Sequence, residues 1–312
     1  MIQEKILVTG GCGYIGSILV PELLREGYFV RVFDNLSCDS GHTMMAHLIN
    51  PNFEFVKGDV RNEQETAKAM EGMDIIIHLA AIVSLASCER NPKLAQEVNV
   101  EGTKNILKNR GDKLIIYAST ISNYGETSTQ MCSEETGLNP KNTYAITKTE
   151  AEKLVKDSGN CIIFRFATAF GCSNRLRINT LINDFAYRAI KDKQLLVYQK
   201  SFKRPFVHIR DITSGLIFAL KNRDKMLNQI YNLGSNEANL TKEDVALIIK
   251  NKVPKFLLFM VDSEGSDDRR NFFIDYSKIS SLGFKTKISV EEGIDELIKG
   301  IGLIDVKNPY VN

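Results

Sequence analysis

The sequence has no tryptophan, few histidines and no long apolar run, and each absence excludes a class of protein. The four histidines show no zinc-like spacing and none of the six cysteines are paired at CxxC spacing, so we expect no metal site and reduced thiols in a cytoplasmic protein. The longest apolar candidate, residues 256–261, is far too short to cross a membrane and predicts a core strand. Lysine and arginine are spread along the chain and the net charge is only +2, which argues against a nucleic-acid partner.

Three glycines near the N-terminus follow a predicted strand and open a predicted helix. Residues 5–8 favour a strand, and glycines stand at 10, 13 and 16. We expect Gly10 to let the chain turn off the strand, Gly13 to admit backbone N–H groups close to a pyrophosphate, and Gly16 to let the helix lie close on the strand. The N-terminus of the helix then favours the bound anion. A glycine turn in some other α/β protein is the alternative.

An acidic residue ends the second predicted strand, residues 28–33. Asp34 at this position can hold the ribose hydroxyls of NAD, and its charge would repel the 2′-phosphate of NADP. No Arg or Lys stands between Asn35 and Gly41 to attract such a phosphate. The sequence therefore predicts NAD as the cofactor.

Strands and helices alternate through the first half of the chain. Further strands are predicted over 53–58, 74–80 and 113–117, with helices between them. This rhythm indicates an α/β fold with a doubly wound parallel sheet. A chain of 312 residues can hold about two domains. We expect a cofactor domain and a smaller, interleaved C-terminal substrate-binding domain, with the boundaries 1–168 and 205–234 for the first and 169–204 and 235–312 for the second.

A tyrosine and a lysine four residues apart open a later helix. Tyr144 and Lys148 share one helix face, and a cation beside a phenol lowers the phenol pKa, which is ordinarily about 10. The pair can supply a general base and its activator, although the same spacing elsewhere is usually a surface pair. Ser119, Thr120 and Ser122 lie at the end of the fifth strand, where open α/β sheets bind ligands.

The order of these motifs resembles that of the extended short-chain dehydrogenase/reductases of the nucleotide-sugar epimerase/dehydratase family. The resemblance implies a Rossmann sheet, NAD, a nucleotide-sugar substrate, and a homodimer formed through the helices after Asn91 and Tyr144. It covers nearly the whole chain and is carried by residues 9–16, Gly58-Asp59-Val60, His78-Leu79-Ala80-Ala81, Asn99, Tyr144 to Lys148, residues 204–211, Leu282-Gly283-Phe284 and Glu291-Glu292-Gly293.

The resemblance also implies roles for individual residues. Tyr144 would be the base, Lys148 would grip the nicotinamide ribose, and Thr120 would hold the reacting sugar hydroxyl. The implied cofactor contacts are Gly10, Gly13, Tyr14, Ile15, Gly16, Asp34, Asn35, Asp59, Val60, Leu79, Ala80, Ala81, Asn99, Tyr144 and Lys148. The implied substrate contacts are Thr120, Thr168, Arg175, Asn179, Arg204 and Arg269.

Two of these arginines come from separate predicted loops. Arginine binds phosphate through two parallel hydrogen bonds, so Arg204 and Arg269 could clamp the substrate diphosphate. The alternative is a pair of solvated arginines, the second neutralised by Asp267 and Asp268.

Two departures from the family pattern narrow the reaction. Ile121 and Ser122 follow Thr120, where the 4,6-dehydratases carry an Asp-Glu pair, so the acid–base pair for eliminating water is absent. Thr168 stands where many 4-epimerases have an asparagine. The stretch 166–171, with Arg175, Arg177 and Asn183, resembles C4 dehydrogenases of GDP-heptoses in bacterial capsule synthesis.

Three functions therefore remain open at this point. The first is a redox-neutral 4-epimerase that oxidises the C4 hydroxyl of a nucleotide sugar and returns the hydride to the other face. The second is a net C4 dehydrogenase, which would use the same Thr120, Tyr144 and Lys148. The third is a non-catalytic NAD sensor that binds a protein partner, although a sensor would have no chemical need for those three residues.

Overall fold

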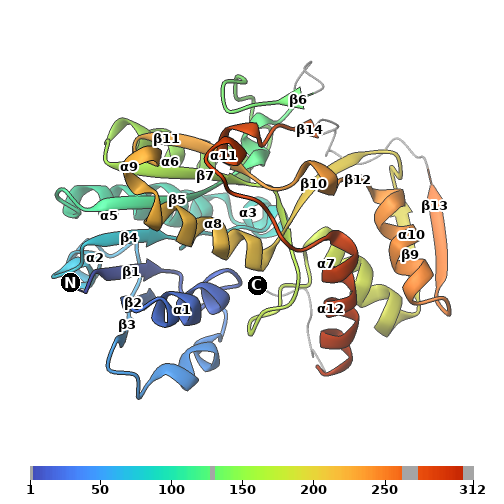
Figure 1. Cartoon of the computed structure of the whole chain (residues 1–312), viewed down its shortest axis with the longest axis horizontal. Helices are drawn as coiled ribbons and strands as arrows, with labels where there is room; N and C mark the ends of the chain where they lie inside the picture. Colours follow the sequence, from blue (N-terminus) through green and yellow to red (C-terminus); the bar gives the residue numbers. More distant parts are fainter. Residues whose placement is uncertain (1–2, 127–130, 262–272, 305–312) are drawn as a thin grey trace.

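A single parallel sheet organises the chain, as a computed structural model of residues 3–126, 131–261 and 273–304 shows (Figure 1). Its strand order is β11–β7–β5–β4–β1–β2–β3, and every neighbouring pair is parallel. The strands are β1 (Lys5–Thr9), β2 (Phe29–Asp34), β3 (Phe53–Lys57), β4 (Ile75–His78), β5 (Leu114–Thr120), β7 (Cys161–Phe166) and β11 (Gln229–Leu233).

Helices cover both faces of this sheet, which is why its central strands are nearly all apolar. Helices α1 (Gly16–Arg25) and α8 (Ile209–Lys221) pack together on one face. The other face is covered by a second group, α2 (Glu63–Met70), α5 (Gly102–Asn109) and α6 (Thr143–Asp157). Alternate residues of β4 enter the two cores that result, with Ile75 and Ile77 in one and Ile76 in the other.

The strand order reverses between β1 and β4. From β1 the chain moves outward through β2 to β3, then returns to place β4 on the other side of β1. The loops that follow β1 and β4 therefore face each other at the carboxyl edge of the sheet, where such folds bind ligands.

A second core lies beside this sheet in the C-terminal half (Figure 1). It is built from Phe170, Ile182, Phe206, Ile249 and Leu297 together with their neighbours. The elements around it are β8 (Thr168–Phe170), α7 (Leu181–Tyr187), β9 (Gln194–Tyr198), β10 (Lys203–His208), β12 (Asn239–Thr241), α10 (Lys242–Lys252), β13 (Leu257–Val261) and α12 (Val290–Gly302). The division into two domains at the boundaries given above stays a prediction.

Several short elements complete the described chain. They are the 3₁₀ turns η1 (Gly41–His47), η3 (Ile121–Tyr124) and η5 (Asn236–Ala238), the helices α3 (Leu85–Arg90), α4 (Pro92–Gln96), α9 (Arg223–Met226) and α11 (Ser277–Ser281), the π-helical turns η2 (Glu97–Glu101) and η4 (Arg188–Asp192), and the paired strands β6 (Met131–Cys132) and β14 (Phe273–Ile274).

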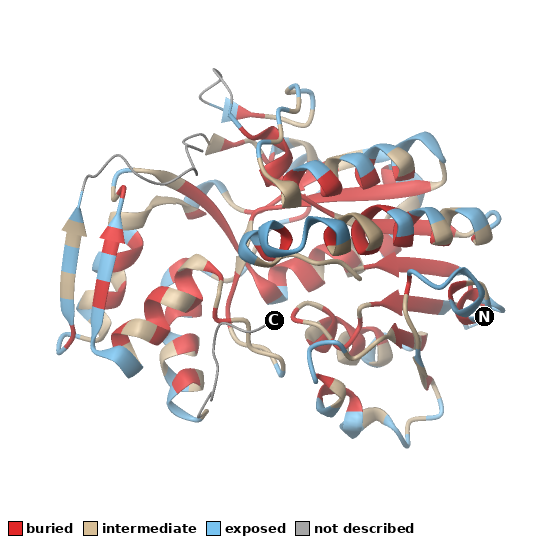
Figure 2. Cartoon of the chain, turned by 180° about the vertical axis from the view of Figure 1, so that it is seen from behind, coloured by how far each residue is buried: buried red, intermediate tan, exposed pale blue. Residues whose placement is uncertain are grey.

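The prediction of a core strand over 256–261 is wrong on one face. Strand β13 pairs with β9 in a two-stranded parallel sheet, and Leu257, Phe259 and Val261 are exposed along it (Figure 2). The intervening Leu258 and Met260 pack against the second core. A two-stranded sheet with helices on one side covers only alternate residues, and a run of apolar residues alone does not reveal this.

Within the described ranges, no helix is both long enough and apolar enough to cross a membrane. The same part of the chain contains no group of three His, Cys, Asp or Glu side chains that could hold a metal ion.

Candidate active site

The loop Gly10–Gly16, called the glycine loop below, leaves space that side chains would fill. Gly10 has φ of +68°, and a Cβ on it would lie 2.7 Å from the backbone of Ala80 in the loop after β4. A Cβ on Gly13 would approach only the carbonyl of Gly10, at 3.1 Å, so its other side is open. The loop fits the diphosphate of a dinucleotide at the N-terminus of α1.

Gly16 permits a close approach within the glycine loop. A Cβ on Gly16 would clash with the carbonyl oxygen of Gly11, which directly follows Gly10 after β1. Gly11 makes the contact with the sheet, because a Cβ there would lie 2.8 Å from both methyl groups of Val32 on β2. The spacing of the glycines gave no signal for this.

Asp34 faces the glycine loop from the end of β2. Its carboxylate accepts hydrogen bonds from the backbone N–H groups of Cys12, at 3.0 Å, and Leu36, at 2.8 Å. Burial raises the pKa of Asp34, while these bonds and the nearby charge of Arg175 lower it. Arg175, predicted to contact substrate, is thus an electrostatic neighbour of Asp34, and its contact with the substrate stays a prediction.

A second acidic group lies at the end of β3. Asn35 donates to the Asp59 carboxylate at 2.9 Å, and Arg61 forms an ion pair with it at 2.8 Å. The hydrogen bond from Arg61 is the main reason that the pKa of Asp59 falls to about 2. Val60 is buried beneath Gly102, where a Cβ would lie 2.7 Å from its side chain.

Hydrogen bonds tie the loop after β4 to β1 on one side and, through Asn99, to α6 on the other. The backbone N–H of Leu79 donates to the carbonyl of Thr9, and that of Ala80 to the Thr9 hydroxyl, at 3.1 and 3.3 Å. Ala81 follows directly. Asn99 accepts from the N–H of Ile82 at 2.8 Å, and its amide also donates to the hydroxyl of Thr147 on α6 at 3.0 Å. Asn99 thus braces the loop against α6.

His78 is a packed histidine, as its apolar neighbours predict. Its Nδ1 lies 2.7 Å from the Thr9 hydroxyl and its Nε2 3.1 Å from that of Thr103. Burial, with a smaller contribution from Lys148, lowers the pKa of His78 to about 3, so the imidazole is neutral at physiological pH.

A side-chain cap fixes where α6 begins. Asn142 accepts a hydrogen bond from the N–H of Ala145 at 2.9 Å, so the helix starts at Thr143. Tyr144 then stands in the first turn, and Lys148 follows one turn later on the same face.

Lys148 is buried, with only 3 % of its surface exposed. Its ammonium lies 4.1 Å from the centre of the Tyr117 ring on β5. Burial lowers the pKa of Lys148 to about 7, against the opposing effects of Glu152 and Cys88. This buried lysine therefore loses its proton far more readily than an exposed lysine does.

Thr120 is the last residue of β5, and it lies beside α6. Its side-chain oxygen accepts a hydrogen bond from the N–H of Ser122 at 3.1 Å, which starts the turn η3. Both β5 and η3 pack against α6. The hydroxyl proton of Thr120 is not used in this bond, so it can be donated to another oxygen.

Behind these residues lies a buried polar network that sequence reasoning missed. Arg165 and Glu152 form an ion pair at 2.7 Å, and both side chains are almost completely buried. Glu152 also accepts from Ser119 at 2.5 Å and from Asn123 at 3.0 Å, while Arg165 donates to the Tyr124 hydroxyl at 3.0 Å. The network ties α6 to β5, β7 and η3. Its only sequence signal is Glu152, four residues after Lys148.

Three of the predicted substrate residues lie in or next to the elements around the second core. Thr168 begins β8, which pairs with β10, the strand that carries Arg204. Arg204 is buried, and one of its bonds goes to the carbonyl of Lys203 at 2.9 Å. Asn179 accepts a hydrogen bond from Arg177 at 2.7 Å. Arg269, with Asp267 and Asp268, lies outside the described residues.

Tyr14 connects the glycine loop to the second half of the chain. Its buried hydroxyl donates to the carbonyl of Gly171 at 2.7 Å and accepts from Asn183 at 3.1 Å. Burial raises the pKa of Tyr14. The side chain is thus occupied within the protein, which leaves the backbone of Tyr14 and Ile15 to face a ligand.

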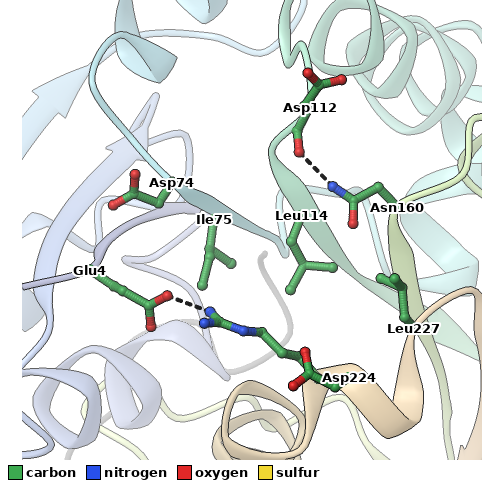
Figure 3. Close-up of a pocket in the computed structure, with 9 residues that line it drawn as sticks. Glu4, Asp74, Ile75, Asp112, Leu114, Asn160, Asp224 and Leu227 are labelled. Atoms are coloured by element: carbon green, nitrogen blue, oxygen red, sulfur yellow. Dashed lines mark hydrogen bonds and ion pairs between the residues drawn. The ribbon is translucent and has the colours of Figure 1, made fainter. Parts of the chain in front are cut away.

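A cavity of about 270 Å³ lies at the opposite edge of the sheet (Figure 3). Its lining includes Glu4, Asp74, Asp112 and Asn160, which precede strands β1, β4, β5 and β7, and Arg223, which pairs with Glu4. This cavity is separate from the glycine loop, Tyr144 and Lys148.

Comparison with known proteins places this arrangement in a family. The model of the NAD dependent epimerase/dehydratase family matches residues 6–234. The chain belongs to this family. The resemblance stated from the sequence is thereby confirmed: this member of the NAD-dependent epimerase/dehydratase family is an enzyme, and its cofactor is NAD.

Relatives of this epimerase/dehydratase family member extend over nearly its whole length. A putative UDP-glucose 4-epimerase of Methanocaldococcus jannaschii is 28% identical over 305 residues, which are 94% of this chain and 97% of the relative. The CDP-paratose 2-epimerase of Salmonella typhi is 27% identical over 339 residues, covering 94% of this chain and 98% of that one.

Solved structures confirm the predicted fold. The UDP-glucuronic acid 4-epimerase from Bacillus cereus matches with a TM-score of 0.85 at 24% identity, covering 96% of this chain and 99% of that one. The UDP-glucose 4-epimerase of Thermus thermophilus matches with a TM-score of 0.83, also at 24% identity, covering 96% and 99%.

The burial of Lys148 predicts how the stability of this family member depends on pH. Folding lowers the Lys148 pKa from 10.5 to about 7, so between these values the unfolded chain holds more protons than the folded one. The free energy of unfolding should therefore rise from about pH 7 to about pH 9.5. Urea unfolding of the NAD-free protein at both pH values, with Lys148→Met as the reference, measures this. A stability difference between the two proteins that does not change with pH would contradict it.

Proposed function

We propose that the protein is an NAD-dependent 4-epimerase of a nucleoside-diphosphate sugar. The observation that carries the proposal is the position of Tyr144 and Lys148 on one face of α6, beside the end of β5 and the cofactor edge of the sheet. The relatives in Methanocaldococcus jannaschii and Salmonella typhi are both named as epimerases of nucleotide sugars, which supports this reaction class.

The cofactor would lie across the ends of β1, β2 and β4. The diphosphate would lie at the N-terminus of α1, where unpaired N–H groups and the helix dipole favour an anion. Asp34 would accept from the ribose hydroxyls with the lone pairs that Cys12 and Leu36 leave free. A 2′-phosphate would meet this carboxylate, so NAD is preferred over NADP.

Tyr144 would remove the proton of the sugar C4 hydroxyl. Thr120 would donate a hydrogen bond to the same oxygen and hold it in place. Lys148 would support the negative charge of the phenolate and hold the nicotinamide ribose. Bound NAD supplies the acceptor for the hydride that leaves C4. The product of this half-reaction is a 4-keto sugar.

Elimination of water is not part of the proposed reaction. Ile121 and Ser122, in the turn after Thr120, are buried and carry no carboxylate. The site would therefore lack the acid and the base that remove a hydroxyl from C6 of a 4-keto sugar. Return of the hydride to the other face of C4 completes an epimerisation.

The remaining assignments are parts of the same proposal. Arg204, together with Arg269, would bind the diphosphate of the substrate, and Thr168 would contact it from the neighbouring strand. The homodimer and the identity of the nucleotide and sugar stay predictions.

Removing the phenolic hydroxyl tests the assigned base. Tyr144→Phe keeps the ring, so the protein should fold and bind NADH normally. We expect kcat to fall at least about a hundredfold, the usual scale of general acid–base catalysis. Tyr198→Phe, at an exposed position on β9, is the matched control and should retain full activity. Normal turnover by Tyr144→Phe would remove this residue from the mechanism.

Absorbance at about 340 nm, where NADH absorbs and NAD does not, separates the epimerase from the net dehydrogenase. Enzyme is mixed with excess NAD and UDP-glucose, and with GDP-, CDP- and dTDP-sugars in parallel. We expect sugar turnover with at most a burst of NADH equal to the enzyme concentration. A steady rise of NADH over many turnovers would contradict epimerisation and support the C4 dehydrogenase.

A further inference from the structure

The segment between β8 and α7 lies along the cofactor site. Within this segment, the carbonyl of Asn174 lies 3.3 Å from Nε2 of His42 in η1, the turn that follows Asp34 in the sequence. Tyr14 of the glycine loop bonds to Gly171. At the other end, Arg177 donates to the carbonyl of Val83, in the loop after β4, at 2.8 Å. The segment therefore contacts both loops that meet where the strand order reverses.

Arg177 carries a charge that these contacts do not neutralise. Its Nε donates to Asn179 at 2.7 Å and its Nη2 to the Val83 carbonyl, and both partners are uncharged. Among the described residues, no ion pair joins Arg177 to an Asp or Glu. Burial lowers its pKa, and the nearby charge of Arg175 adds to this effect.

An anion bound beside Arg177 would offset the free-energy cost of holding its unpaired charge in the folded protein. A partly buried guanidinium without a counter-ion destabilises the folded chain, and two arginines close together add repulsion. The electrostatic neighbours of Arg177 include the hydroxyls of Tyr14 and Tyr144, which mark the glycine loop and the reacting end of the site. Asn183 links Tyr14 to Arg177, because its amide donates to the Tyr14 hydroxyl at 3.1 Å and to the carbonyl of Arg177 at 2.8 Å. A diphosphate at the glycine loop would therefore lie near Arg177.

We propose that Arg177 binds the diphosphate of NAD from the side opposite the N-terminus of α1. The loop after β4 and Asn179 orient the guanidinium, so its remaining N–H groups can meet phosphate oxygens. Asn179 is then a positioning residue for the cofactor and not a substrate contact. This inference rests on NAD binding, and not on which sugar reacts or whether hydride returns to it.

The test is the affinity of the NAD-free protein for NADH, measured by fluorescence titration and calorimetry. Arg177→Met should weaken NADH binding about 10- to 100-fold, the scale of one or two charge-assisted hydrogen bonds. Arg177→Lys keeps the charge but loses the planar pair of N–H donors, so its affinity for NADH should lie between those of the wild type and Arg177→Met. Arg188→Met, which removes a half-exposed guanidinium paired with Asp184, is the matched control and should bind NADH as the wild type does.

Two fragments of the cofactor distinguish anion binding from a structural effect. ADP-ribose contains the diphosphate, so Arg177→Met should weaken it as much as NADH. Adenosine has no phosphate, so its affinity should not change. An equal loss for adenosine would mean that Arg177 only holds the loop at Val83. Unchanged NADH affinity in both Arg177 variants, with or without a raised KM for the nucleotide sugar, would also overturn the proposal. Loss of activity in Tyr144→Phe bears on the reaction and leaves this inference untouched.

Discussion

The close approach of Gly10 to Ala80 is the contact on which the site depends. It joins the loop after β1 to the loop after β4, at the place where the strand order of the sheet reverses, and a side chain on Gly10 would separate them. Asn99 extends the same contact to Thr147 on α6. The cofactor edge and the helix that carries the proposed base are thus parts of one bonded assembly.

Burial of charged side chains determines the pKa of Lys148 and the cost of breaking the ion pair between Arg165 and Glu152. Lys148 is buried near the cofactor edge of the sheet, and burial lowers its pKa to about 7. The charge of Glu152, one helical turn later, acts in the opposite direction and raises the pKa of Lys148. Glu152 is itself held by Arg165, so breaking the buried pair would leave an uncompensated charge beneath the site. In the proposed complex, the anionic diphosphate of NAD would lie beside Arg177, with Arg175 nearby.

Local patterns predicted the parts of the molecule that depend on short stretches of chain. The glycine spacing, Asp34 at a strand end, and Tyr144 with Lys148 each occupy a few consecutive residues, and strand alternation gave the parallel sheet. Long-range contacts carry no such signal. The pairing of Arg165 with Glu152 joins β7 to α6, and the approach of Gly11 to Val32 depends on how the loop lies on β2.

The proposed 4-epimerase transfers a hydride from C4 of the sugar to NAD and returns it to the same carbon. A nucleotide sugar carrying deuterium at C4 tests it, with mass spectrometry and proton NMR of sugar and cofactor after many turnovers in ordinary water. For a 4-epimerase we expect an epimerised sugar that keeps its deuterium at C4 and takes up no hydrogen from water. Deuterium in released NADH, or loss of deuterium from the sugar to water, would contradict it.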